Sequence, residues 1–232
     1  MKLARNVTVL INNLMDQLIP PALRDARWFM ELPMKLFAGD KADIYMNFKE
    51  RAFDMSPQEF AHAYEQTGGI VARETDLNKE CIIRILASIA GQNLLEAGCG
   101  RGALVRQLSP LYKMTACDVV VSEELKAKYP SVTFHETNIE KLPFPDNAFD
   151  TVICTHTLEH VVDIQAAIAE LRRVAGKRLI VVVPRERPYR YTFSLHLHFF
   201  PYKHSLLYVM GKHGARRTCE NVGGDWLYIE DK

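Results

Sequence analysis

The feature that most limits what this chain can fold into is an alternation of short apolar runs with amphipathic stretches, which begins near residue 76. Five of the runs have the composition of β-strands: Asn93–Ala97, Met114–Cys117, Val132–His135, Thr151–Thr155 and Arg178–Val183. Between the last two, Asp163–Val174 places its apolar residues on one face of a helix. Strands that alternate with helices form a mostly parallel sheet with helices on both faces. We therefore predict an α/β fold.

The last part of the chain departs from this alternation. Two strand-like runs, Ala215–Val222 and Asp225–Glu230, flank the pair Gly223–Gly224. Two glycines between such runs are typical of a tight antiparallel turn. We predict a C-terminal antiparallel hairpin that closes one edge of the sheet.

The first 75 residues show no strand-like alternation and are rich in aromatic residues, Met and Pro. Val7–Ile19 and Pro57–Glu65 have helical patterns, and prolines, Pro33 among them, are expected to break the helices of this region. We therefore predict two domains, a helical N-terminal extension or lid over residues 1–75 and an α/β domain over residues 76–232.

Composition narrows the classes of protein that fit. The 29 basic and 28 acidic residues give a formal net charge of +1, so no overall field would attract nucleic acid. Five cysteines, an odd number without a C-x-x-C pair, suit a reducing compartment better than a disulfide framework. We find no apolar run long enough to span a bilayer and no pattern typical of a signal peptide. We expect a cytoplasmic protein.

The strongest functional signal is the segment Leu94–Gly102, which reads Leu-Leu-Glu-Ala-Gly-Cys-Gly-Arg-Gly and leaves the first predicted strand. Glycines at alternate positions let a backbone turn tightly and approach a ligand. The spacing is G-x-G-x-G rather than the G-x-G-x-x-G of dinucleotide sites, and Glu96 stands just before the glycines. A carboxylate there would repel a pyrophosphate but suits a ligand with an ammonium group.

This acidic residue followed by G-x-G-x-G resembles the first motif of the class I S-adenosylmethionine (SAM)-dependent methyltransferases, which have a Rossmann-like fold. The resemblance covers roughly residues 76–232. It implies that Glu96 faces the methionine amino group of SAM, directly or through water. It also implies that three glycines border the methionine and ribose: Gly98, Gly100 and Gly102. The alternative is that these glycines only form a turn.

A second acidic residue, Asp118, closes the predicted strand Met114–Cys117, about twenty residues beyond the glycines. In the family that this chain resembles, the residue at this position accepts hydrogen bonds from two ribose hydroxyls. Taken alone, Asp118 would be interpreted as a solvated carboxylate at a strand end. The further candidates for SAM binding are Cys99, Val119, Asn138, Ile139 and Thr155.

Two further patterns refine the resemblance. The family commonly has an acidic residue where Asn138 stands, which binds the adenine amino group, and an asparagine carbonyl can accept the same hydrogen bond. Leu142–Asp150 is close to the L-P-F-x-D-x-x-F-D signature of a large subgroup that contains many small-molecule methyltransferases. The resemblance therefore implies a small-molecule acceptor.

The segment Cys154–Val161 leaves the carboxyl end of a central predicted strand, where such sheets bind their ligands. Because the sulfonium of SAM already activates the methyl group, the enzyme mainly aligns the reactants. An oxygen acceptor also needs a base, and we predict that His156 serves as the catalytic base if it is neutral. Glu159 and His160 belong to the L-E-H that is common in the subgroup, and in the simpler interpretation they only cap and orient the next helix.

His156, Glu159 and His160 also form H-x-x-E-H, which is similar to the E-x-x-E-H of metal-dependent small-RNA 2′-O-methyltransferases. In that interpretation His196 or His198 would complete the site. Because L-E-H is widespread without a metal, we expect no bound metal.

Between Arg185 and Arg217, basic residues greatly outnumber the single acidic residue, Glu186. In the family that this chain resembles, the region after the fifth strand helps to build the acceptor pocket. We predict an acceptor that carries phosphate or carboxylate, and the alternative is a solvated basic face. The candidate acceptor-binding residues are Tyr64, Arg185, Arg190, His196 and His198.

Together these patterns predict methyl transfer from SAM to a small-molecule acceptor, at oxygen, with S-adenosylhomocysteine as the second product. Two alternatives stay open: RNA methylation, which the near-neutral charge disfavours, and a non-catalytic SAM-binding partner subunit. We expect no nucleic-acid partner. Leu10–Leu36 is compatible with peripheral contact with a membrane, and packing against the core is the alternative.

Overall fold

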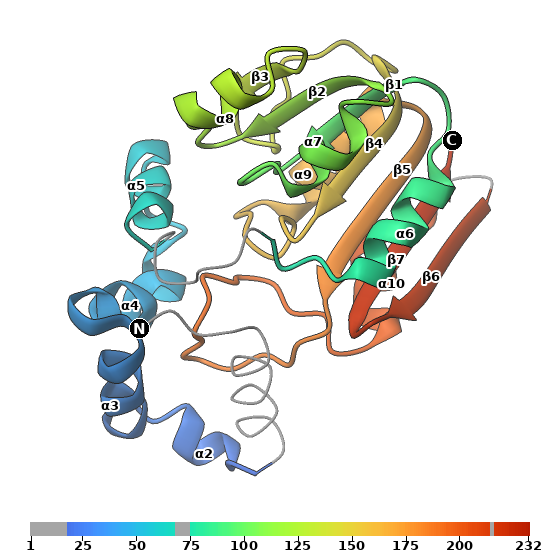
Figure 1. Cartoon of the computed structure of the whole chain (residues 1–232). Coiled ribbons are helices and arrows are strands. Elements are labelled where there is room, and N and C mark those ends of the chain that lie inside the picture. The colour runs from blue at the N-terminus through green and yellow to red at the C-terminus, as the bar shows by residue number, and fades with distance from the viewer. Residues whose placement is uncertain (1–17, 68–74, 214–215) are drawn as a thin grey trace. The chain divides into compact units, whose positions relative to one another are not determined.

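A computed structural model of the chain describes residues 18–67, 75–213 and 216–232. Internal contacts divide these residues into two compact units (Figure 1). The first unit holds the described residues up to 67 together with 187–197, and the second holds 75–186 and the described part of 198–232. The predicted α/β domain included 187–197, but Tyr191 and Leu195 of this segment are buried in the core of the first unit.

The second unit is built on one seven-stranded sheet in the order β3-β2-β1-β4-β5-β7-β6. Strands β1 to β5 pair in parallel, and the hairpin of β6 and β7 joins β5 in antiparallel fashion. This arrangement confirms the predicted Rossmann-like sheet with its C-terminal hairpin. The strands are β1 (Asn93–Ala97), β2 (Lys113–Asp118), β3 (Thr133–Glu136), β4 (Phe149–Thr155), β5 (Ala175–Pro184), β6 (Arg216–Val222) and β7 (Asp225–Asp231).

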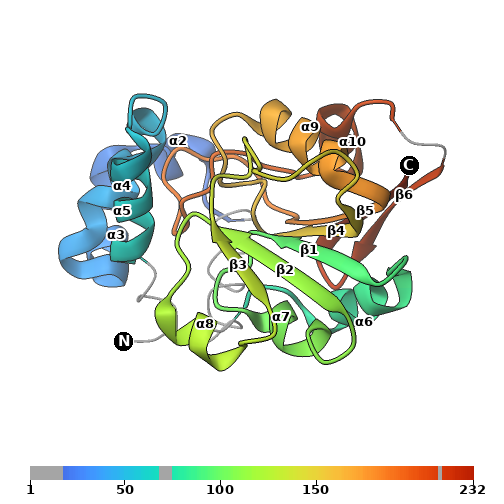
Figure 2. The same ribbon diagram turned by 90° about the horizontal axis from the view of Figure 1, so that it is seen from above.

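Helices cover both faces of this sheet, as Figure 2 shows. They are α6 (Lys79–Ser88), α7 (Ala103–Leu108), α8 (Glu123–Lys128), α9 (Ile164–Val174) and α10 (Lys203–Met210). One core contains side chains of α6, α7 and α8, and the other contains side chains of α9 and α10. The central strands β1, β4 and β5 contribute to both cores, which is why each contains consecutive apolar residues.

Local signals set the ends of these helices. The Asn78 side chain accepts a hydrogen bond from the backbone of Cys81 and caps α6, and Asp163 caps α9 in the same way. The apolar residues of α9 that share a face are buried, as predicted. All five cysteines are buried free thiols.

The first unit is helical, as predicted for the N-terminal region. Its elements are α2 (Pro21–Arg24), α3 (Arg27–Ala38), the 3₁₀ helix η1 (Gly39–Lys41), α4 (Ala42–Arg51) and α5 (Pro57–Thr67). The predicted break at Pro33 was wrong, because α3 continues through this residue while Met30 and Met34 stay fully buried on either side of it. The predicted helix Val7–Ile19 lies almost wholly outside the described residues.

One face of α3 remains exposed in this unit. Trp28, Leu32 and Leu36 follow one another at intervals of one turn and are 73%, 65% and 78% exposed. Beside them the Lys35 ammonium pairs with the Glu31 carboxylate at 2.8 Å. Within the described residues, we find no helix that is both long and apolar enough to cross a membrane. Peripheral contact with a membrane through Leu10–Leu36 stays a prediction.

Candidate functional site

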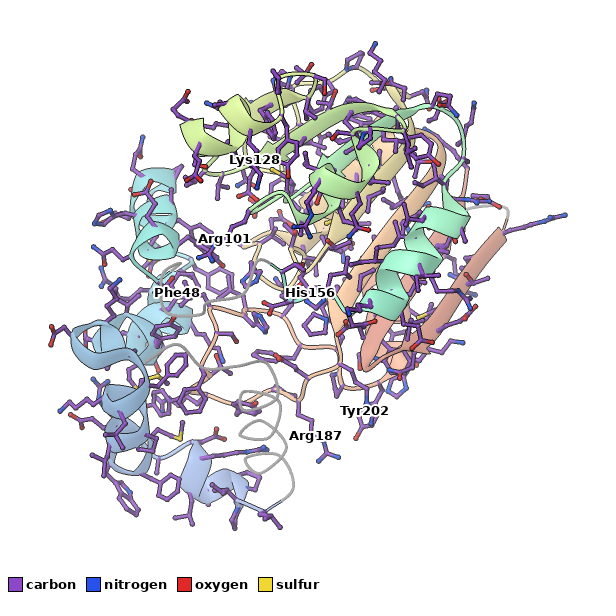
Figure 3. All side chains as sticks on the ribbon, in the orientation of Figure 1. Phe48, Arg101, Lys128, His156, Arg187 and Tyr202 are labelled. Atoms are coloured by element: carbon purple, nitrogen blue, oxygen red, sulfur yellow. The ribbon has the colours of Figure 1, made fainter. Side chains whose placement is uncertain are left out.

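The candidate site lies at the carboxyl edge of the parallel strands in the second unit. The chain leaves β1 toward β2 on one side and reaches β4 on the other, so the order of strands reverses between β1 and β4. The loop after β1 is tied to its neighbour, since the backbone N–H groups of Gly98 and Cys99 both donate to the Cys117 carbonyl. Figure 3 labels Arg101 in this loop and His156 just beyond β4.

The three glycines of the loop have positive φ angles, but they are glycine for different reasons. A Cβ atom on Gly98 would overlap the side chain of Thr157, and one on Gly102 would overlap Leu125. A Cβ atom on Gly100 would meet nothing within 4 Å. Gly98 and Gly102 therefore permit close packing within the protein, whereas Gly100 leaves a cradle that a ligand can enter.

Glu96 lies within β1 beneath this loop and is only 2% exposed. Burial and the nearby Asp118 carboxylate raise the pKa of Glu96 well above its usual value, and a backbone hydrogen bond from Val105 opposes this shift only in part. The Oε2 atom of Glu96 has no hydrogen-bond partner among the described residues. A buried acceptor of this kind is costly unless a donor or cation meets it, and it fits a ligand ammonium group.

Asp118 lies at the end of β2, beside the same loop. Its Oδ2 atom accepts a hydrogen bond from the Gly100 N–H at 2.8 Å. Burial raises the pKa of Asp118, and hydrogen bonds from the backbone of Gly100, Val120 and Val119 oppose the increase. These bonds fix the carboxylate in place, and its two oxygens together offer more acceptor positions than these three backbone bonds use.

The other predicted SAM-binding residues differ in how far they reach the surface. Asn138 is exposed, and its Oδ1 atom already accepts a hydrogen bond from the Glu140 N–H at 2.9 Å. Ile139 and Cys99 are buried, Thr155 is partly accessible, and Val119 is exposed. An amide oxygen has two lone pairs, so the local turn at Asn138 leaves room for one further donor.

His156 has an environment that the sequence did not reveal. Its Nδ1 atom lies 3.4 Å from Oε1 of Glu159, and its Nε2 atom lies 3.4 Å from Oδ2 of Asp225. Burial alone lowers the pKa of His156, but the two carboxylates outweigh this effect and raise the pKa to about 10. The imidazole is therefore a cation near neutral pH. The predicted catalytic base had to be neutral, and His156 does not meet that condition.

The same charge state bears on the metal candidates. A protonated imidazole has no lone pair for a metal, so His156 does not fit as a ligand in this arrangement. The Nε2 atom of His198 lies 2.9 Å from the Val161 carbonyl, and its backbone N–H donates to the Glu159 carbonyl. His198 therefore holds the turn after β4. Glu159 is fully buried in that turn, and His160 is partly buried next to it.

The predicted acceptor-binding residues are divided between the units. Tyr64 belongs to the first unit, where its hydroxyl donates to the Leu195 carbonyl at 3.3 Å. The guanidinium of Arg190 pairs with the Glu50 carboxylate at 2.6 Å in the same unit, so an anionic ligand would have to compete with Glu50. His196 also lies in the first unit, whereas Arg185 lies exposed in the second. Their role in acceptor binding stays a prediction.

Three residues around the site were missed by the sequence analysis: Thr157, Asn78 and Asp225. Thr157 packs onto Gly98, and Asn78 donates to Oδ2 of Asp225 at 2.8 Å. The sequence feature that could have identified Asp225 is its position directly after Gly223–Gly224, at the start of the second strand of the hairpin. Its partner His156 is far away in sequence, and only the pairing of β7 with β5 brings the two together.

Comparison with known proteins agrees with this fold. Residues 95–181 match a family model described as a methyltransferase domain. A probable S-adenosylmethionine-dependent methyltransferase of Mycolicibacterium smegmatis is 31% identical over 114 residues, which are 48% of this chain and 44% of that protein. The ubiquinone/menaquinone biosynthesis C-methyltransferase UbiE of Stutzerimonas stutzeri is 33% identical over 148 residues, 58% of this chain and 57% of that protein. The chain thus spans about half the length of these curated relatives.

A solved structure shows the same fold over more of the chain. The 1,6-didemethyltoxoflavin-N1-methyltransferase of Burkholderia thailandensis, solved with S-adenosylhomocysteine, has a TM-score of 0.55 and 17% identity. The match covers 76% of this chain and 86% of that one. At this identity the likeness concerns the fold alone.

Proposed function

We propose, from the premise that this chain belongs to the class I SAM-dependent methyltransferases, that it transfers the methyl group of SAM to an oxygen atom of a small anionic acceptor. The observation that carries the proposal is the buried Glu96 carboxyl, whose Oε2 atom has no partner among the described residues. This carboxyl stands under a glycine loop and beside a second carboxylate, Asp118. The methionine ammonium of SAM is the kind of cation that such an oxygen accepts.

The residues present fit SAM at three points. Glu96 would bind the ammonium group, directly or through water. The open cradle over Gly100 lets the backbone approach the ligand, and the fixed carboxylate of Asp118 suits the ribose hydroxyls. Each point uses a feature of the free protein that is otherwise costly or unexplained.

When bound, SAM supplies a methyl carbon that its sulfonium has made electrophilic. The protein then has to hold the acceptor oxygen in line with that carbon and the sulfur, and to keep water away from them. Since His156 is protonated, it does not remove a proton from a neutral alcohol. The proposal therefore favours an acceptor oxygen that is ionised in solution, such as a carboxylate or an acidic phenol.

The basic residues after β5, Arg185 among them, favour an anionic acceptor on charge alone. One relative is named a C-methyltransferase, which makes methylation at carbon the second candidate. An ionised phenol supports both reactions, because its negative charge is shared between oxygen and ring carbons. We propose in addition that the acceptor is a small molecule and that the protein is cytoplasmic.

Calorimetric titration of the full chain with SAM, followed by an assay for S-adenosylhomocysteine release, tests the proposal. The acceptor panel contains carboxylates, acidic phenols and phosphorylated sugars, each matched with an uncharged analogue that keeps a free hydroxyl group, together with a pool of RNA. We expect SAM to bind and the anionic members to be turned over faster than their neutral partners. Binding without turnover of any acceptor would favour the non-catalytic subunit, and turnover of RNA alone would favour the other alternative. Failure to bind SAM would end the proposal.

A further inference from the structure

We propose that His156 is a positioning residue, which Glu159 and Asp225 hold in place so that the turn after β4 sets the glycine loop for SAM. This inference rests on the proposed function, because it assigns a role at the same binding site. It replaces the role of base, which the charge of His156 does not allow.

Two segments far apart in sequence meet at His156. Glu159 follows it in the turn after β4, and Asp225 begins β7 on the other side of β5. The side chains of His156, Glu159 and Asp225 are 14%, 0% and 8% exposed. An imidazole between two buried carboxylates thus joins the end of β4 to the start of β7.

Further contacts fix the Asp225 side of this arrangement. The Asn78 amide donates to Oδ2 of Asp225 at 2.8 Å and to the Val222 carbonyl at 2.9 Å. Through the same side chain Asn78 caps α6. Asp225 is therefore held in place from the α6 side by a side chain that also contacts the end of β6.

Among the described residues, Glu159 and Asp225 are the titratable groups that set the charge of His156. The shift of its pKa comes from Glu159 and Asp225 together with burial. From β5 the His156 backbone N–H contacts the Val182 carbonyl, and Pro184 lies opposite Asp225 in the sheet register. From α6 the facing side chain is the uncharged amide of Asn78. One cation between two anions explains why a charged group is tolerated here.

The turn held in this way reaches the glycine loop directly. His156 has a left-handed backbone conformation, with φ of 50°, which is uncommon for a residue other than glycine. The next residue, Thr157, donates from its hydroxyl to the Thr155 carbonyl at 3.0 Å and occupies the space that a side chain on Gly98 would need. Only one side chain therefore separates the turn after β4 from the loop that faces the ligand.

The test compares Asp225→Asn and His156→Gln in the full-length protein with a control, Glu220→Gln. Glu220 is a half-exposed carboxylate on β6 that pairs with Arg84 and lies outside the site. For each protein, the imidazole of His156 is titrated by NMR, unfolding is followed in urea, and SAM binding is measured by calorimetry under conditions where the protein is folded. His156→Gln identifies the imidazole signal by its loss.

We expect His156 in the unchanged protein to stay protonated up to about pH 10 and to titrate at lower pH in Asp225→Asn. Both site variants should bind SAM more weakly, by a factor on the order of ten or more, since small displacements of a binding loop are costly. Glu220→Gln should bind as the unchanged protein does. If His156→Gln does not fold, Asp225→Asn carries the test, because the asparagine carbonyl can still accept the bond from Asn78.

The inference is overturned if His156 titrates near its ordinary pKa, or if folded Asp225→Asn and His156→Gln bind SAM as tightly as the control. A purely structural role would lower the urea midpoint and leave the dissociation constant of the folded protein unchanged. If the unchanged protein does not bind SAM, the proposed function fails, and the NMR titration still decides whether the two carboxylates hold His156 as a cation.

Discussion

At the residue scale, the site is defined by buried ionisable groups, and two of them have no partner of opposite charge among the residues that the structure describes. Glu96 and Asp118 both have raised pKa values, because burial disfavours their charged forms. No cation in the described part of the chain contributes to either shift. His156 is the opposite case, a cation between two carboxylates. The first pair is suited to receive a positive ligand, and His156 is already neutralised by its own neighbours.

Glu96→Gln should change the affinity for SAM while leaving the free energy of unfolding nearly unchanged. Glutamine matches the neutral form of Glu96 in shape and can accept the same backbone bond, so we expect the free energy of unfolding to change by less than about 1 kcal/mol. A hydrogen bond between charged groups is worth roughly 1.5–3 kcal/mol, so the dissociation constant for SAM should rise about ten- to hundredfold. Urea denaturation and calorimetry measure the two quantities.

The matched control for Glu96→Gln is Glu123→Gln, which alters an exposed carboxylate at the start of α8. We expect no change in SAM binding for this control. An unaltered dissociation constant in Glu96→Gln would remove the main support for the assigned binding mode.

How far the sequence could predict the site depended on the distance along the chain between partners. Glu96, the glycines and Asp118 could be predicted as candidates because each stands at a fixed place at the end of its own strand or directly after it. The charge of His156 was not found, since it depends on Asp225, which only the hairpin brings near. The different roles of Gly98 and Gly100 were hidden for the same reason, because Thr157 approaches Gly98 from another strand.

At the scale of elements, one buried cluster joins α9, α10 and the hairpin. Arg172 on α9 donates to both carboxylate oxygens of Glu230 on β7, at 2.9 and 2.7 Å, and to the Met210 carbonyl at the end of α10. The Tyr228 hydroxyl donates to the same carboxylate. Burial raises the pKa of Glu230, but Arg172 and Tyr228 outweigh it and lower the pKa overall.

Arg172→Met should therefore be strongly destabilising. The change leaves Glu230 buried without its cation, and we expect a loss of about 3 kcal/mol in the free energy of unfolding at neutral pH. Because the lowered pKa of Glu230 stabilises the fold only above its unfolded value, the difference from the unchanged protein should shrink as the pH falls and the carboxyl takes up a proton.

Arg84→Met is the comparison for this prediction, since it breaks a half-exposed pair with Glu220 and should cost less than about 1 kcal/mol. Urea denaturation at two pH values measures both variants. Equal stability of Arg172→Met and Arg84→Met would show that the buried cluster does not hold the hairpin in place.

Most elements followed from local patterns, and the exceptions have physical causes. The strands, α9 and the hairpin were expected where they occur, because apolar periodicity and turn residues set them. Pro33 did not end α3, since the flanking Met30 and Met34 are buried in the core and compensate for the lost backbone bond. Such compensation comes from tertiary packing, which a local pattern does not contain.

At the scale of the whole molecule, the chain forms its second unit in two parts. It leaves that unit after β5, contributes residues 187–197 to the first unit, and returns to build α10 and the hairpin. No local pattern marked this excursion, because the aromatic residues of 187–197 suit any core. The SAM-binding candidates Glu96, Gly100 and Asp118 all lie in the second unit, so the binding claim concerns that unit alone.

The most direct test of the central claim is the number of protons that leave the protein when SAM binds. Calorimetry in buffers of different ionisation enthalpy measures it between about pH 5.5 and 7, where the ammonium of SAM is charged. A raised pKa in the free protein means that Glu96 must lose a proton to meet this ammonium, so affinity should increase with pH and protons should be released. Glu96→Gln should release fewer protons and show a weaker pH dependence. Equal proton release by the two proteins would contradict the claim that Glu96 receives the ammonium group of SAM.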